Sequence, residues 1–167
     1  INTHRFVFGA QFFYDHLKHV EGAMNGKPFE LETWQMALVG NLFGWKEWKP
    51  IGWVRRYSSV FLYVARKNGK TPLVAGIALY VFVCDEEMGQ QNYCSAYNKE
   101  QANMLFRQAR LNVEKNPELA KRITVYTGMG QRSMEIKQEG SYFRVIAADD
   151  AGVHGQNQHL VVVDEVH

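Results

Sequence analysis

A short run of residues from Val64 to Thr71 combines a glycine, a lysine and a hydroxyl in an order suited to phosphate chemistry. It matches the pattern G-x4-G-K-S/T, except that Val64 stands where the pattern has its first glycine. Gly69 lets the backbone turn closely under phosphate groups, and the N–H groups at the start of a helix point at them. Lys70 would neutralise the β- and γ-phosphates, and Thr71 would offer its hydroxyl to Mg²⁺. The run therefore predicts a site for ATP with Mg²⁺.

Two adjacent carboxylates end a second apolar run. Residues 160–163 read Leu-Val-Val-Val, and Asp164 and Glu165 follow them, as in a Walker B element. At the carboxyl edge of a parallel sheet, where the ligands of such sheets bind, these acids would lie beside the phosphate loop. Asp164 would hold Mg²⁺, directly or through water, and Glu165 would orient and deprotonate the attacking water. Acids often end strands, but the two motifs together favour a P-loop ATPase.

The elements that must position these residues follow the order of an α/β protein. The pattern predicts a strand over 60–65, covered on both faces, and a helix over 70–84. After a strand over 92–97, Asn98 would cap a helix with the apolar face Ala102, Leu105, Phe106, Ala109 and Val113. Further strands are expected over 123–127, 133–137, 142–147 and 160–164, the middle two as a hairpin. The predicted fold is an α/β P-loop NTPase (RecA-like, ASCE), with a mainly parallel central sheet flanked by helices and truncated after the Walker B strand.

Helices and an aromatic, basic stretch precede this core. We expect helices over 11–24 and 32–43, and an irregular segment or exposed hairpin over 45–57. In that stretch aromatic residues interleave with cations: Trp45, Trp48, Trp53 and Tyr57 with Lys46, Lys49, Arg55 and Arg56. They form either a surface for the DNA backbone or a partner protein, or a capping subdomain with packed aromatic rings and solvated cations. The second interpretation is preferred, because spacing alone does not align the cations on one face. The domain boundary is placed between residues 1–57 and the ATPase core, 58–167.

Composition argues against two classes of protein. The 167 residues carry a formal charge of +2 and are 46% hydrophobic, which is typical of a soluble domain with one core. No apolar run reaches the roughly 18–20 residues that span a bilayer, and the first residues do not form a secretory signal. Cys84 and Cys94 lack metal-site or redox spacing, so they are expected to be reduced core residues of an intracellular protein.

Two histidines precede the last expected strand. His154 and His159 flank a short Gly-Gln-Asn segment. Ordinary loop composition explains them, and a γ-phosphate-sensing role is the alternative if the loop reaches the phosphate side of the sheet.

Taken together, these motifs resemble the large terminase subunit of tailed bacteriophages. The likeness runs from Phe29 onward. Besides the two ATP motifs, it rests on Gln101-Ala102, Gly155 and the closing Val-Asp-Glu-Val-His. In this family the phosphate loop often lacks its first glycine and carries an early arginine. The segment 29–35 is similar to the family's adenine-binding segment. The resemblance implies nucleotide binding by Gln35, Arg66, Lys67, Asn68, Gly69, Lys70 and Thr71, catalysis by Glu165 and Arg66, and metal binding by Thr71 and Asp164. Arg66 would act as an arginine that stabilises charge on the transferred phosphoryl group.

The family implies an ATP-driven motor that packs double-stranded DNA into a procapsid through the portal protein, in the host cytoplasm and without a membrane. It further implies a small terminase subunit as partner, a homo-oligomeric ring, and a nuclease domain beyond His167. This fragment is therefore expected to bind nucleotide with at most weak hydrolysis. Two alternatives stay open: a helicase-like DExH ATPase that acts on nucleic acid, suggested by the run from Asp164 to His167, and a non-catalytic assembly module with a degenerate nucleotide site.

Overall fold

The computed structural model of the chain describes residues 3–65, 67–85, 87–96, 99–128, 132–147 and 158–164. These residues form two units, Ile1–Lys70 and Thr71–His167, which are described separately. The boundary expected between residues 57 and 58 falls inside the first unit, and it stays a prediction.

The first unit is built on two helices and a hairpin. Its elements are α1 (Thr3–His16), the short 3-10 helix η1 (Gly22–Met24), α2 (Thr33–Gly44), β1 (Lys46–Lys49) and β2 (Gly52–Arg55). Its buried apolar side chains come mainly from α1, α2 and the segment between them: Phe12, Phe13, Leu17, Phe29, Val39 and Phe43. Burial of these rings and aliphatic groups fixes how α1 and α2 pack.

Helix α1 ends at His16, so the helix predicted over 11–24 is wrong in its second half. The backbone after His16 pairs with the segment that returns towards α2. The N–H of His19 donates to the carbonyl of Lys27 at 2.9 Å, and the N–H of Phe29 donates to the carbonyl of Leu17 at 2.9 Å. These bonds satisfy backbone groups that a longer helix would have used internally.

The aromatic, basic stretch forms the β1–β2 hairpin, one of its two expected forms. Trp48 lies opposite Trp53 in the antiparallel register, and their ring centroids are 5.5 Å apart in an edge-to-face arrangement. Both rings are exposed, as is Ile51 in the turn. The two indoles therefore stabilise the hairpin by a cross-strand contact while they remain accessible.

The strand predicted over 60–65 is wrong, because the structure has no regular element there. Phe61 and Tyr63 are 82% and 93% exposed, whereas the prediction required burial on both faces. A β-prone segment becomes a strand only when a neighbour pairs with its backbone, and no described segment pairs with this one. Its apolar composition alone does not create that partner.

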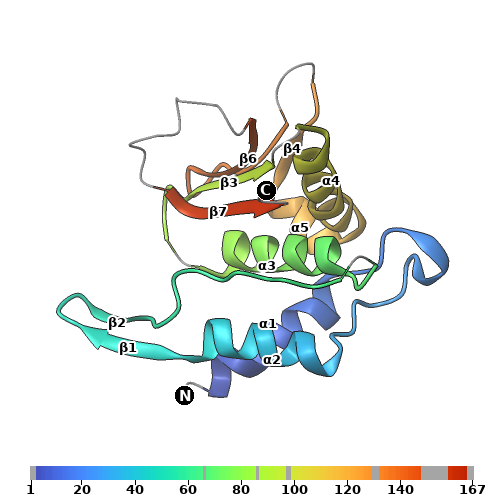
Figure 1. Ribbon diagram of the computed structural model, residues 1–167. Coiled ribbons are helices and arrows are strands. Elements are labelled where there is room, and N and C mark those ends of the chain that lie inside the picture. Colours follow the sequence, from blue (N-terminus) through green and yellow to red (C-terminus); the bar gives the residue numbers. More distant parts are fainter. Residues whose placement is uncertain are drawn as a thin grey trace. The chain divides into compact units, whose positions relative to one another are not determined.

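The second unit is an α/β structure with a mixed sheet (Figure 1). Its elements are α3 (Lys70–Cys84), which begins at the last residue of the first unit, β3 (Gln91–Ala96), α4 (Lys99–Lys115), α5 (Pro117–Arg122), β4 (Thr124–Tyr126), β5 (Ser133–Ile136), β6 (Ser141–Ala147) and β7 (Gln158–Asp164). Among the described residues the strand order is β4-β5-β6-β3-β7. β3 is parallel to β6 and β7, and β5 is antiparallel to β4 and β6. The α/β prediction and the β5–β6 hairpin are confirmed, and the sheet is more mixed than expected.

One aromatic ring joins the helices to this sheet. Phe143 of β6 lies with its ring centroid 6.3 Å from Phe82 of α3 and 6.2 Å from Phe106 of α4. The predicted apolar face of α4 is buried: Ala102, Leu105, Phe106, Ala109 and Val113. The core thus forms where α3 and α4 meet the sheet.

A helix that the sequence reading missed follows α4. Asn116 follows α4, and its side-chain oxygen accepts hydrogen bonds from the N–H groups of Glu118 and Leu119. Pro117 occupies the first position of α5, where a missing N–H has no cost. The expected cap Asn98 lies outside the described residues. No helix in the described segments is both long and apolar enough to cross a membrane.

Candidate nucleotide-binding site

The loop before α3 has a backbone shape suited to holding an anion. Lys67 and Gly69 have φ angles of +69° and +66°, in the left-handed region. Within the described segments, Lys67 is the only non-glycine residue with a positive φ. A side chain in that region costs about 1–2 kcal/mol, and such strain tends to persist at ligand sites. Since residues 67–69 are exposed, a ligand can reach this loop.

The loop leads directly into the first turn of α3. Lys70 and Thr71 are the first two residues of this 15-residue helix, and no acidic residue lies in its first turn. The N–H groups of that turn have no partners within the helix, and the helix dipole makes this end positive. An anion such as a phosphate group is therefore favoured where the sequence predicted it.

Gln35 lies beside this loop, within the first unit. Its side chain is buried in the first turn of α2, where Oε1 accepts a hydrogen bond of 2.9 Å from the N–H of Glu32. Its Nε2 lies 3.7 Å from the point that a Cβ on Gly69 would occupy. The structure thus brings together Gln35 and Gly69, two predicted site residues separated by 34 positions (69 − 35).

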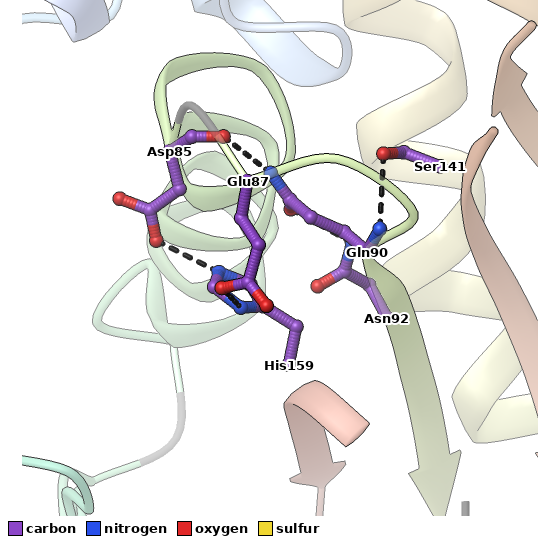
Figure 2. A network of polar contacts seen from close by, with 6 residues as sticks. All are labelled: Asp85, Glu87, Gln90, Asn92, Ser141 and His159. Carbon is purple, nitrogen blue, oxygen red and sulfur yellow. Dashed lines mark hydrogen bonds and ion pairs between the residues drawn. The ribbon is translucent and has the colours of Figure 1, made fainter. Parts of the chain in front are cut away.

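A polar network ties the end of α3 to the start of β7 (Figure 2). His159, the second residue of β7, lies with Nε2 2.9 Å from Oδ2 of Asp85 and Nδ1 2.8 Å from Oε2 of Glu87. Each ring nitrogen of His159 therefore faces one carboxylate oxygen. The side chains of His159 and Asp85 are mostly buried, at 12% and 11% exposed. This bridge joins two elements that the sequence separates widely.

Further hydrogen bonds hold the segment between α3 and β3. The side-chain amide of Gln90 donates to the carbonyl of Asp85, and the N–H of Gln90 donates to Oγ of Ser141 at 3.0 Å. The side chain of Asn92 donates to that of Gln90 at 3.2 Å. The end of α3 is therefore fixed against both β7 and the start of β6 (Figure 2).

This arrangement orients α3 relative to the strand that ends in Asp164. Because the end of α3 lies at the start of β7, the two elements run in opposite directions, as Figure 1 shows. Thr71 in the first turn of α3 and Asp164 at the end of β7 consequently belong to the same, carboxyl edge of the sheet. A hydroxyl and a carboxylate are ligands that Mg²⁺ accepts.

The structure does not describe every predicted site residue. Arg66 and Glu165 lie outside the described residues, and only the backbone of Asp164 is described. The γ-phosphate-sensing alternative does not hold for His159, which lies at the opposite end of β7 from Asp164. His154 lies outside the described residues. Sequence reading missed the bridge because Asp85 and Glu87 are more than 70 positions from His159, and no local pattern marks the contact.

Comparison with known proteins decides the family. Residues 33–167 match the family model described as "Terminase large subunit, ATPase domain". The chain belongs to this family. It is 30% identical to the large subunit of the terminase of Enterobacteria phage HK97 over 146 residues, which are 87% of this chain and 27% of that protein. The resemblance to large terminase subunits is thereby confirmed.

A solved structure supports the fold independently. The crystal structure of the HK97 bacteriophage large terminase is similar to this chain with a TM-score of 0.77 and 24% sequence identity. The match covers 96% of this chain and 31% of the crystallised chain, so in both comparisons with HK97 this chain spans less than a third of the relative's length. The likeness supports the predicted P-loop NTPase fold.

Proposed function

We propose that this chain is the ATP-hydrolysing motor domain of a viral large terminase subunit, and that it drives double-stranded DNA into a procapsid. One observation carries the proposal. The match to the terminase ATPase domain covers the left-handed loop at residues 67–69 that opens into α3, where a triphosphate would bind.

Each predicted residue has a distinct role in the proposed reaction. The backbone of Lys67, Asn68 and Gly69 surrounds the phosphates, and Lys70 neutralises their charge. Gln35, fixed beside the loop, contacts the adenine base. Arg66 stabilises the charge that develops on the transferred phosphoryl group, a contribution worth about 10³–10⁵ in rate where it has been measured. Glu165 accepts a proton from the attacking water, which typically contributes about 10²–10⁴.

The residues present also fit Mg²⁺. Thr71 and Asp164 would hold it with one hydroxyl and one carboxylate oxygen, the hard donors that this ion prefers, and phosphate oxygens and water would complete its shell. Bound there, Mg²⁺ supplies positive charge to the phosphate oxygens.

For the full-length protein we propose a ring of identical subunits at the portal of the procapsid, in the host cytoplasm. A small terminase subunit would serve as partner, and a nuclease domain would lie elsewhere in the chain. The matched family is a terminase family, and no observation favours the helicase-like alternative. The non-catalytic alternative predicts no ATP hydrolysis, so a hydrolysis assay distinguishes it from the proposal.

A binding experiment tests the nucleotide site. A fluorescent ATP analogue is titrated with and without Mg²⁺ into the parent chain, Lys70→Ala, Glu165→Gln and the control Lys121→Ala, whose lysine is exposed on α5. We expect Mg²⁺-dependent binding by the parent, Glu165→Gln and the control, and a loss of about tenfold or more in Lys70→Ala. Equal binding by Lys70→Ala and the parent, or no binding by the parent, contradicts the proposal.

A further inference from the structure

Gln35 is a polar residue on the buried side of α2. It is 4% exposed, and Val39 and Phe43, four and eight positions later, are buried as well. Because residues four apart lie on the same side of a helix, Gln35 begins an otherwise apolar row. A buried amide needs hydrogen-bond partners, so its place in this row depends on what its oxygen and its nitrogen contact.

The oxygen of this amide has its partner at the start of α2. Glu32 is the N-cap of the helix, and its N–H donates to Oε1 of Gln35 at 2.9 Å. The carbonyl of Glu32 accepts a hydrogen bond of 2.8 Å from the N–H of Met36, and its carboxylate accepts one of 2.7 Å from the indole of Trp34. The N-cap residue is therefore held through three different groups, and the orientation of the Gln35 amide is fixed with it.

The nitrogen of the amide faces the loop before α3 instead. Nε2 lies 3.7 Å from the point that a Cβ on Gly69 would occupy, and in the described part of the chain no other atom outside the neighbouring residues lies within 4 Å of that point. Oε1 and Nε2 diverge from one carbon atom, so the bond from Glu32 to Oε1 directs Nε2 away from the N-cap. A ligand at this loop therefore meets the N–H donors of Gln35 and not its acceptor.

We propose that Gln35 recognises the base of a bound nucleotide as a hydrogen-bond donor alone, so that the site selects purine nucleotides and does not separate ATP from GTP. This selectivity rests on the proposed function, which places the base at Gln35. Adenine and guanine share an acceptor at N7, whereas the N6 amino group of adenine is a donor and needs an acceptor. Pyrimidine bases have no N7, so they lack the atom that Nε2 would contact.

A purely structural role for Gln35, as a cap of α2, is the alternative. Glutamine and glutamate both suit this position of a capping box, so Gln35→Glu separates the two roles. The variant keeps an oxygen for the N–H of Glu32 and replaces the donor Nε2 with a second oxygen of similar size. If capping were the only role, the variant would discriminate among nucleotides as the parent does.

The test measures displacement of the fluorescent ATP analogue, with Mg²⁺, by ATP, GTP, CTP and 7-deaza-ATP, in which a C–H group replaces N7. For the parent chain we expect ATP and GTP to bind within about threefold of each other. CTP and 7-deaza-ATP should bind about fivefold or more weaker than ATP, the effect of one lost hydrogen bond. This series needs no variant, so it does not depend on how a substituted chain folds.

The variant Gln35→Glu assigns the difference to Gln35. We expect ATP and 7-deaza-ATP to bind this variant equally, because the donor that distinguishes them is gone. The ratio of the two affinities is compared within one protein, so a general effect of the added negative charge on phosphate binding cancels. Gln11→Glu makes the same chemical change at an exposed position of α1 and should keep the parental ratio.

Three results would overturn this selectivity. If the parent binds ATP more than about tenfold tighter than GTP, an acceptor reads the N6 amino group of adenine. If the parent binds ATP and 7-deaza-ATP equally, N7 is not contacted. If Gln35→Glu keeps the parental ratio, Gln35 only caps α2. In all three cases the parent still binds ATP. If the parent binds no nucleotide, the proposed function fails and the selectivity with it, so the two failures are distinguishable.

Discussion

Replacing Gly69 with alanine tests whether the loop before α3 is shaped for phosphate. The φ angle of +66° puts Gly69 in the left-handed region, where an alanine costs about 1–2 kcal/mol. Space is not the limit, because the added Cβ would lie 3.7 Å from Nε2 of Gln35, an ordinary van der Waals distance. Alanine also lowers the conformational entropy of the unfolded chain, which offsets about 0.4–1 kcal/mol of this cost. Because residues 67–69 are exposed, the free loop can escape this cost by leaving the left-handed conformation, so we expect the free energy of unfolding to fall by less than about 1 kcal/mol.

The same change has a second, functional effect. If Gly69→Ala relieves its strain by leaving the left-handed conformation, binding of nucleotide must restore that conformation. A penalty of about 1–2 kcal/mol corresponds to a loss of about 5- to 30-fold in affinity. This loss is specific to a loop that must keep its shape around phosphate groups.

Gly140 provides a matched control. Its φ angle is +67°, and nothing lies within 4 Å of the position that its Cβ would take. Gly140→Ala therefore carries the same backbone penalty in the β5–β6 turn, without a phosphate role. Urea denaturation should give a loss of no more than about 1–2 kcal/mol for either variant, whereas titration with the fluorescent ATP analogue should show weaker binding only for Gly69→Ala. Parental affinity in Gly69→Ala, or an equal loss of affinity in Gly140→Ala, would show that nucleotide binding does not depend on the left-handed shape of this loop.

Three further predictions concern stability. In His159→Ala the mostly buried carboxylate of Asp85 loses its hydrogen-bond partner, so urea denaturation should show a loss of about 1–3 kcal/mol. A loss no larger than that of Arg122→Ala, from an exposed ion pair, contradicts this. Burial raises the pKa of Cys94 from 9.0 to about 12, so the folded chain holds this proton above pH 9 while the unfolded chain releases it. The contribution of Cys94 to stability is thus fully present below pH 9 and falls by about 1.4 kcal/mol per pH unit towards pH 12; a difference between parent and Cys94→Ala that does not change with pH counts against it. Phe61→Ser should change the free energy of unfolding by no more than about 0.5 kcal/mol, because Phe61 is exposed. A larger loss would indicate that residues 60–65 are buried, as the sequence predicted.

Features set by neighbours in sequence could be predicted from the sequence. The apolar spacing of α4 identified its buried face, and the turn between β5 and β6 identified their hairpin. The Gly-Lys-Thr run located the loop and the helix start, because glycine at a left-handed position and a hydroxyl in a first helical turn are local requirements.

Features that depend on distant partners could not be predicted. The run over 60–65 has the composition of a strand, but composition does not specify which segment pairs with it. Helix α1 ends early because the backbone near Leu17 pairs with the backbone at Phe29, a contact that hydrophobic spacing does not encode. The contact between His159 and Asp85 likewise depends on the tertiary fold, because it forms only when the end of α3 lies beside the start of β7.

The proposed ATPase site is tested most directly by the rate of ATP hydrolysis with Mg²⁺, measured for the parent chain and for Glu165→Gln, with binding of the ATP analogue measured on the same samples. We expect slow, Mg²⁺-dependent hydrolysis by the parent. Glu165→Gln should bind the analogue normally while its hydrolysis falls by about 10²–10⁴, because the base is lost and the phosphate loop is intact. Hydrolysis by Glu165→Gln at the parental rate would show that Glu165 is not the catalytic base, and would count against an ATPase site at this edge of the sheet.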